Sequence, residues 1–193
     1  MDPITADPSP EMIASVCKAL STPRSTLLEA AGTDPGLYAL YGDPAVWLEL
    51  GLGNAPPGAA LYVGKTEAMP FRAVRTAQST VRRSFAALLR DHLALRGIPR
   101  NQTKPERLAE FALSEEQDVM LTEWLDARLE MAVWTKPPEC AVLGEIEVAV
   151  LKRWSPPLNL RDNRSTWGAR VSAALKLMAS DARTWARERG HRL

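Results

Sequence analysis

The chain has 193 residues, of which 46% are hydrophobic and 24% charged, as expected for one soluble globular domain that needs no disulfide or structural metal. It contains no run of about 18 apolar residues, which excludes a membrane-spanning helix. Its acidic, proline-rich first residues are unlike a signal peptide, so we expect a cytoplasmic protein. The two cysteines lie far apart and lack the spacing of zinc ligands.

The formal net charge of +1 results from four segments of alternating sign. The net charge is −5 over residues 1–64, +6 over 65–100, −7 over 101–149 and +7 over 150–193. Of the 24 basic residues 18 are Arg, the side chain that binds phosphate with two nitrogens. The pattern indicates either a surface that faces phosphates or the solvated basic faces of ordinary helices, and charge alone leaves both open.

The first part of the chain is predicted to alternate helix and strand. A helix is expected to begin at Ser9-Pro10-Glu11 and continue to Leu20, and a second short helix is possible over 25–31. The apolar, aromatic stretch 36–41 predicts a strand. The Gly- and Pro-rich stretch 42–58 predicts a loop, and 59–64 predicts a second strand that completes a hairpin.

The rest of the chain is predicted to be mainly helical. A helix begins at Ser79 or Thr80 and has apolar residues as far as Leu95, with His92 on that face as a core histidine rather than a metal ligand. The remaining elements are a loop over 97–105, a helix from the capping box at Ser114 to Leu129, a strand over 131–135, and helices over 140–154 and 166–189. Three short strands with flanking helices indicate an α+β fold with a small three-stranded antiparallel sheet.

Phosphate-binding and dispersed motifs were compared with the sequence. Residues 58–66 (GAALYVGKT) have the wrong spacing for a P-loop, and the part that should be the loop has the pattern of a strand. Two strands carry Gly36-Leu-Tyr38 and Tyr62-Val-Gly64-Lys65, and Arg72 follows ten residues after Tyr62. A glutamate within an apolar helical stretch, Glu147, precedes Asn159 by twelve residues.

In this order and at these spacings, the motifs resemble the GIY-YIG endonuclease superfamily, and in particular its bacterial single-domain members. The resemblance covers about residues 34–163. It implies that 1–33 form an N-terminal helical extension and that 164–193 form a basic C-terminal helix packed on the same domain. The spacing favours Glu147 over the neighbouring Glu145.

The resemblance implies a DNA endonuclease that uses one divalent cation, Mg²⁺ or Mn²⁺. Glu147 would hold the cation, and Arg72 would stabilise the charge that develops on the phosphoryl group. Either Tyr38 or Tyr62 would activate water, with Lys65 among the positive charges that make a tyrosine a usable base.

The same resemblance implies supporting residues. Asn159 would organise the helix end and loop around the metal site. The basic segment after the second strand would hold DNA backbone phosphates, and its candidate side chains are Arg75, Arg82, Arg83 and Arg90.

Two departures from the superfamily pattern keep other functions open. Many relatives carry His or Tyr one helical turn after the arginine, where this chain has Thr76, so Arg75 is an alternative catalytic arginine. Tyr38 and Tyr62 are 24 residues apart, about double the usual separation. A catalytically degenerate module that binds nucleic acid or protein is the alternative function, and an unrelated α+β interaction domain is the third.

Overall fold

The computed structural model describes residues 8–22, 25–27, 34–66, 79–102, 111–138, 143–160, 163 and 165–191. Its helices are α1 (Pro10–Leu20), α2 (Pro44–Glu49), α4 (Thr80–Leu88), α5 (Glu115–Arg128), α6 (Leu143–Trp154) and α7 (Thr166–Glu188). Its strands are β1 (Ser25–Thr26), β2 (Gly36–Tyr41), β3 (Tyr62–Thr66), β4 (Ile98–Pro99), β5 (Phe111–Ala112) and β6 (Glu130–Thr135). Within this part of the chain, no helix has the length and apolar character needed to cross a membrane.

The main sheet has the strand order β1-β6-β2-β3, and all three pairings are antiparallel. This confirms the predicted α+β class with an antiparallel sheet, but the predicted number of three strands is wrong. The fourth strand is β1, which contributes two residues beside β6, where the sequence suggested the start of a helix. So short a strand has no periodicity of its own and forms only because a partner strand is available.

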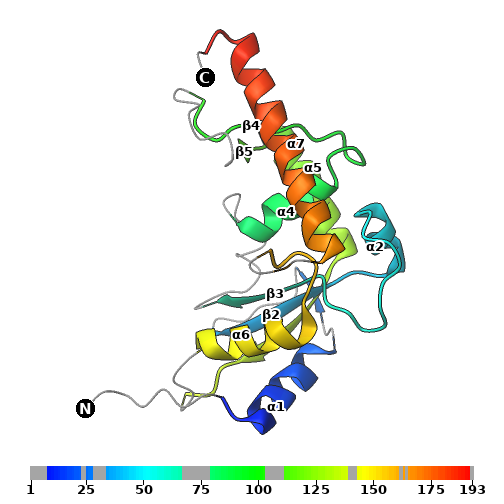
Figure 1. The fold of residues 1–193 in the computed structure, drawn as a ribbon, viewed down its shortest axis with the longest axis vertical. Helices are drawn as coiled ribbons and strands as arrows, with labels where there is room; N and C mark the ends of the chain where they lie inside the picture. The colour runs from blue at the N-terminus through cyan, green and yellow to red at the C-terminus, as the bar shows by residue number, and fades with distance from the viewer. Residues whose placement is uncertain are drawn as a thin grey trace, which may run out of the picture.

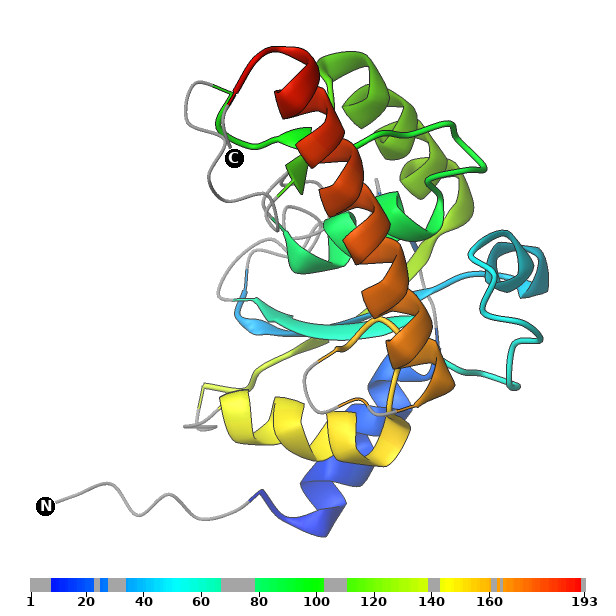
Figure 2. The ribbon, with the colours of Figure 1, turned by 45° about the horizontal axis from the view of Figure 1, so that its top comes forward.

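Helices cover both faces of the sheet (Figure 1). Helices α1 and α6 lie on one face, and α4, α5 and α7 lie on the other, an arrangement that Figure 2 shows from a second direction. The side chains of β2 alternate between the two cores, because successive residues of a strand point to opposite faces. Leu37 and Ala39 pack with α1 and α6, whereas Tyr38 and Leu40 pack with the other helices. Every residue of β2 is therefore buried, which explains its uninterrupted apolar sequence.

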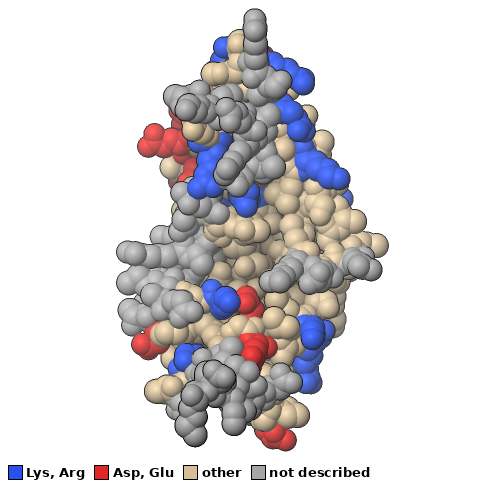
Figure 3. Space-filling view, turned by 60° about the vertical axis from the view of Figure 1, so that its left-hand side comes forward, with Lys and Arg blue, Asp and Glu red and all other residues tan. Residues whose placement is uncertain are grey.

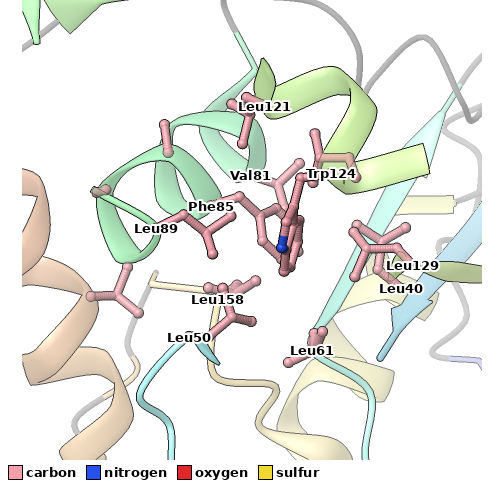
Figure 4. Packing of buried hydrophobic residues seen from close by; sticks show 14 of the residues in the cluster. Leu40, Leu50, Leu61, Val81, Phe85, Leu89, Leu121, Trp124, Leu129 and Leu158 are labelled. Atoms are coloured by element: carbon pink, nitrogen blue, oxygen red, sulfur yellow. The ribbon is translucent and has the colours of Figure 1, made fainter. Parts of the chain in front are cut away.

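The larger core joins α4 and α5 to the sheet (Figure 4). Val81, Phe85 and Leu89 point from α4 and the turn after it toward Leu121 and Trp124 of α5. The rings of Phe85 and Trp124 lie 6.1 Å apart. The predicted continuation of α4 to Leu95 is wrong, since the helix ends at Leu88 and turns follow. The apolar spacing persisted because Leu89 and Leu95 are still buried from within those turns.

Other element boundaries also depart from the sequence prediction. The predicted loop 42–58 contains α2, which begins with Asp43 as its cap and Pro44 as its first residue, a favoured helix start that the surrounding Gly and Pro residues obscured. The second strand begins at Tyr62 rather than at residue 59 and continues to Thr66. His92 lies outside any helix, and its side chain is 3.8 Å from the Glu49 carboxylate. Cys17 is buried, whereas Cys140 lies outside the described residues.

Candidate active site beside strand β3

Two tyrosines from adjacent strands meet on one face of the sheet. Tyr38 of β2 is opposite Gly64 of β3, and Tyr62 lies two residues before Gly64 on the same face. The two rings are 5.9 Å apart and inclined by 44°. A Cβ added at Gly64 would lie 2.7 Å from Tyr62 Cε1 and 2.8 Å from the Tyr38 hydroxyl oxygen. Glycine at this position therefore leaves the space that the tyrosine pair occupies.

The hydroxyl groups of the two tyrosines differ in their surroundings. Tyr38 is 2% exposed, whereas Tyr62 is only partly buried. Burial raises the pKa of Tyr38 well above its ordinary value, and the charge and hydrogen bond of Tyr62 and the charge of Glu147 raise it further. Burial and Glu147 also raise the pKa of Tyr62, while its hydrogen bond with Tyr38 lowers it. These opposite effects are those expected when Tyr38 donates the hydrogen bond and Tyr62 accepts it.

Glu147 approaches the tyrosine pair from α6. The helix buries Leu143, Ile146 and Val150 against the sheet, which leaves Glu147 at the flank of this apolar stripe with a side chain 20% exposed. Its Oε2 atom lies 3.7 Å from Nζ of Lys65, which is 50% exposed. The carboxylate is thus partly solvated, and its negative charge acts on both tyrosines.

Asn159 acts on the backbone of β3. Its Oδ1 accepts a hydrogen bond of 2.9 Å from the Val63 N–H, and its Nδ2 donates one of 2.7 Å to the Val63 carbonyl. The Leu158 N–H donates to the Leu61 carbonyl at 3.0 Å. The segment after α6 therefore fixes β3 at the residue between Tyr62 and Gly64.

The candidate DNA-binding arginines have different environments. Arg82 is 2% exposed and pairs with Asp118 at 2.8 Å, and Arg83 lies beside it in α4. Arg90 contacts Asp181 of α7 through Nε and Nη2, both at 2.8 Å, and Asp181 raises its pKa. Arg90 therefore joins the turn after α4 to α7. Arg72 and Arg75 lie outside the described residues.

Sequence reasoning missed an ion-pair cluster around Glu49 of α2. The Glu49 carboxylate accepts hydrogen bonds from Arg128 at 2.6 Å and from the Trp124 indole at 3.1 Å. These partners lie 75 and 79 residues away in the chain, so no local spacing could indicate them. The cluster connects α2 to α5.

On one flank of the molecule, Lys and Arg side chains gather over the upper half, and in the lower half they alternate with Asp and Glu (Figure 3). Among the described residues, no group of three or more His, Cys, Asp or Glu side chains could hold a metal ion. The site thus offers the single carboxylate of Glu147, which fits a cation such as Mg²⁺ that keeps most of its water ligands and also binds phosphate oxygens.

Comparison with known proteins supplies the family. The family model described as the GIY-YIG catalytic domain matches residues 60–181, a range that begins just before β3 and extends into α7. No curated protein and no solved structure matches the chain significantly. The matched range contains Tyr62, Glu147 and Asn159, and β2 with Tyr38 pairs directly with its first strand. The chain therefore belongs to the GIY-YIG catalytic domain family, a family of nucleases.

Proposed function

We propose that the protein is a divalent-metal-dependent DNA endonuclease that hydrolyses phosphodiester bonds. The observation that carries this proposal is the meeting of Tyr38, Tyr62 and Glu147 beside β3, in a chain of a nuclease family. Glu147 would hold one Mg²⁺ or Mn²⁺, which when bound would supply Lewis acidity at the phosphoryl group. The part-solvated carboxylate supports this role, because a buried or fully paired one could not accept a hydrated cation.

Tyr62 is the better candidate for the residue that orients or deprotonates water. It is the more exposed of the two tyrosines, and its oxygen accepts the hydrogen bond from Tyr38. That hydrogen bond stabilises the phenolate form of Tyr62, since a donor close to an oxyanion favours ionisation. Lys65 lies on the same strand and would add positive charge, and Arg72 would stabilise the charge on the phosphoryl oxygens.

The degenerate alternative also has an observation in its favour. The Lys65 ammonium lies 3.7 Å from Glu147 and could occupy the position of the cation. A plasmid assay separates the two functions. We expect nicking of supercoiled DNA with Mg²⁺ or Mn²⁺ and none after EDTA treatment. DNA binding without cleavage of duplex, single-stranded or flapped substrates in either metal would contradict the nuclease and support the binding module.

A pair of conservative variants tests the order of the tyrosines. Tyr62→Phe should lower the cleavage rate by about 10²–10⁴-fold, the range found when a general base is lost. Tyr38→Phe should lower it only about tenfold, because it removes one hydrogen bond worth about 1 kcal/mol. Loss of this bond raises the pKa of Tyr62, so the basic limb of the pH–rate profile should move to higher pH. A larger loss in Tyr38→Phe would reverse the two roles.

A further inference from the structure

A cavity of about 300 Å³ lies between α4, α5 and β5, away from the tyrosine pair in the chain. Arg82 and Arg83 line it from α4, and Asp118 lines it from α5. Phe111 and Leu113 form part of its apolar wall. It thus combines two guanidinium groups with a hydrophobic surface.

Arg82 is held in a fixed orientation but is not fully satisfied. Its Nε and Nη2 atoms donate to the Asp118 carboxylate at 3.1 and 2.8 Å, and Nη2 also donates to Thr122 Oγ1 at 2.7 Å. Its Nη1 is buried and has no acceptor among the described residues. A buried N–H without a partner is costly, and a bound acceptor would remove that cost.

Arg83 provides a second unused donor. Its Nε is also buried without an acceptor among the described residues, and within them no carboxylate forms an ion pair with it. Asp118 already pairs with Arg82, and Glu115, the other carboxylate of the lining, is exposed in the first turn of α5. The positive charge of Arg83 therefore favours a negatively charged acceptor over a neutral one.

We propose that this cavity binds one backbone phosphate of a nucleic-acid strand, with the adjoining sugar against Phe111 and Leu113. The proposal rests on the proposed function and adds a second point of contact for the strand. Arg83 Nε and Arg82 Nη1 would donate to the phosphate oxygens. Arg82 is fixed beforehand by Asp118 and Thr122, so little side-chain freedom would be lost on binding.

Strand binding measured in EDTA, where no cleavage occurs, tests the proposal. For Arg83→Gln, the slope of log K against log salt for a single-stranded oligonucleotide should fall by about 0.7, the loss of one phosphate contact. Arg82→Lys keeps the charge but lacks a second nitrogen, and should lower the slope similarly. Lys18→Gln removes an exposed charge from α1, across the sheet, and should leave the slope unchanged. Circular dichroism would show that each variant is folded.

Inorganic phosphate is the second probe. In ¹⁵N-labelled protein, the Arg83 Nε–H resonance should shift on titration with phosphate, and the shift should be absent in Arg83→Gln. An unchanged slope in Arg83→Gln, in a protein that still cleaves plasmid, would overturn the cavity proposal alone. A phosphate shift without any effect on strand binding would overturn it too, as it would show a site for free phosphate. A lowered slope in a protein that never cleaves would overturn the nuclease proposal alone.

Discussion

Glu147→Gln should reduce DNA cleavage by about 10³-fold or more, because it removes the only described carboxylate beside the tyrosine pair and hence several kcal/mol of metal-dependent stabilisation. Glu145→Gln removes an equal charge two residues earlier in the same helix, and should leave the rate within about threefold. The measurement is the initial rate of plasmid nicking at saturating Mg²⁺. Equal losses in the two variants would show that the charge of α6, rather than a cation ligand, matters.

The same variant has an effect that needs neither metal nor DNA. The charge of Glu147 raises the pKa of both tyrosines, so Glu147→Gln should move their titration to lower pH. Tyrosine absorbance during an alkaline titration would show the shift. The stability of the protein should change little, since the pair with the half-exposed Lys65 is loose and screened by solvent. A strongly destabilised Glu147→Gln would contradict this description of the site.

Gly64→Ala should destabilise the protein by about 1–3 kcal/mol and reduce cleavage together with stability. The new Cβ would lie 2.7–2.8 Å from both tyrosine rings, so the rings must separate or the strand must shift. Denaturant unfolding would give the stability, and the activity assay would show whether the displaced rings still support cleavage.

Gly144→Ala is the matched control. A Cβ at Gly144 would meet only Lys65 Nζ, at an ordinary 3.5 Å, and alanine is favoured over glycine in a helix by up to about 1 kcal/mol. We therefore expect this variant to be as stable as the native protein or more so, with cleavage retained. A Gly64→Ala protein that matches Gly144→Ala in both respects would show that the tyrosine pair does not need its present spacing.

The sequence predicted those parts of the fold that are specified by local periodicity. The amphipathic helices α1, α5 and α7 and the central strand β2 were placed within a few residues, because their apolar positions repeat with one period over the whole element. The elements that it missed are short and depend on tertiary contacts. Helix α2 has only six residues and is held by Glu49, whose partners lie in a helix more than 70 residues away.

The candidate site was predictable as a set of residues but not as a geometry. Spacing selected Tyr62, Glu147 and Asn159, yet it could not show that Asn159 binds the backbone of Val63. Nor could spacing distinguish arginines on a common basic segment. Arg82 has a predominantly intramolecular partner in Asp118, and Arg90 has one in Asp181, and both partners come from distant parts of the chain.

The amide of Asn159 has a further consequence for how the molecule behaves among copies of itself. A strand at the margin of a sheet is a template to which another chain can add, and proteins commonly guard such margins against aggregation. Here one side chain occupies both the donor and the acceptor of Val63, and the Leu158 N–H occupies the carbonyl of Leu61. A foreign strand therefore cannot extend the sheet at this point, and the margin is left for ligands that bind through side chains.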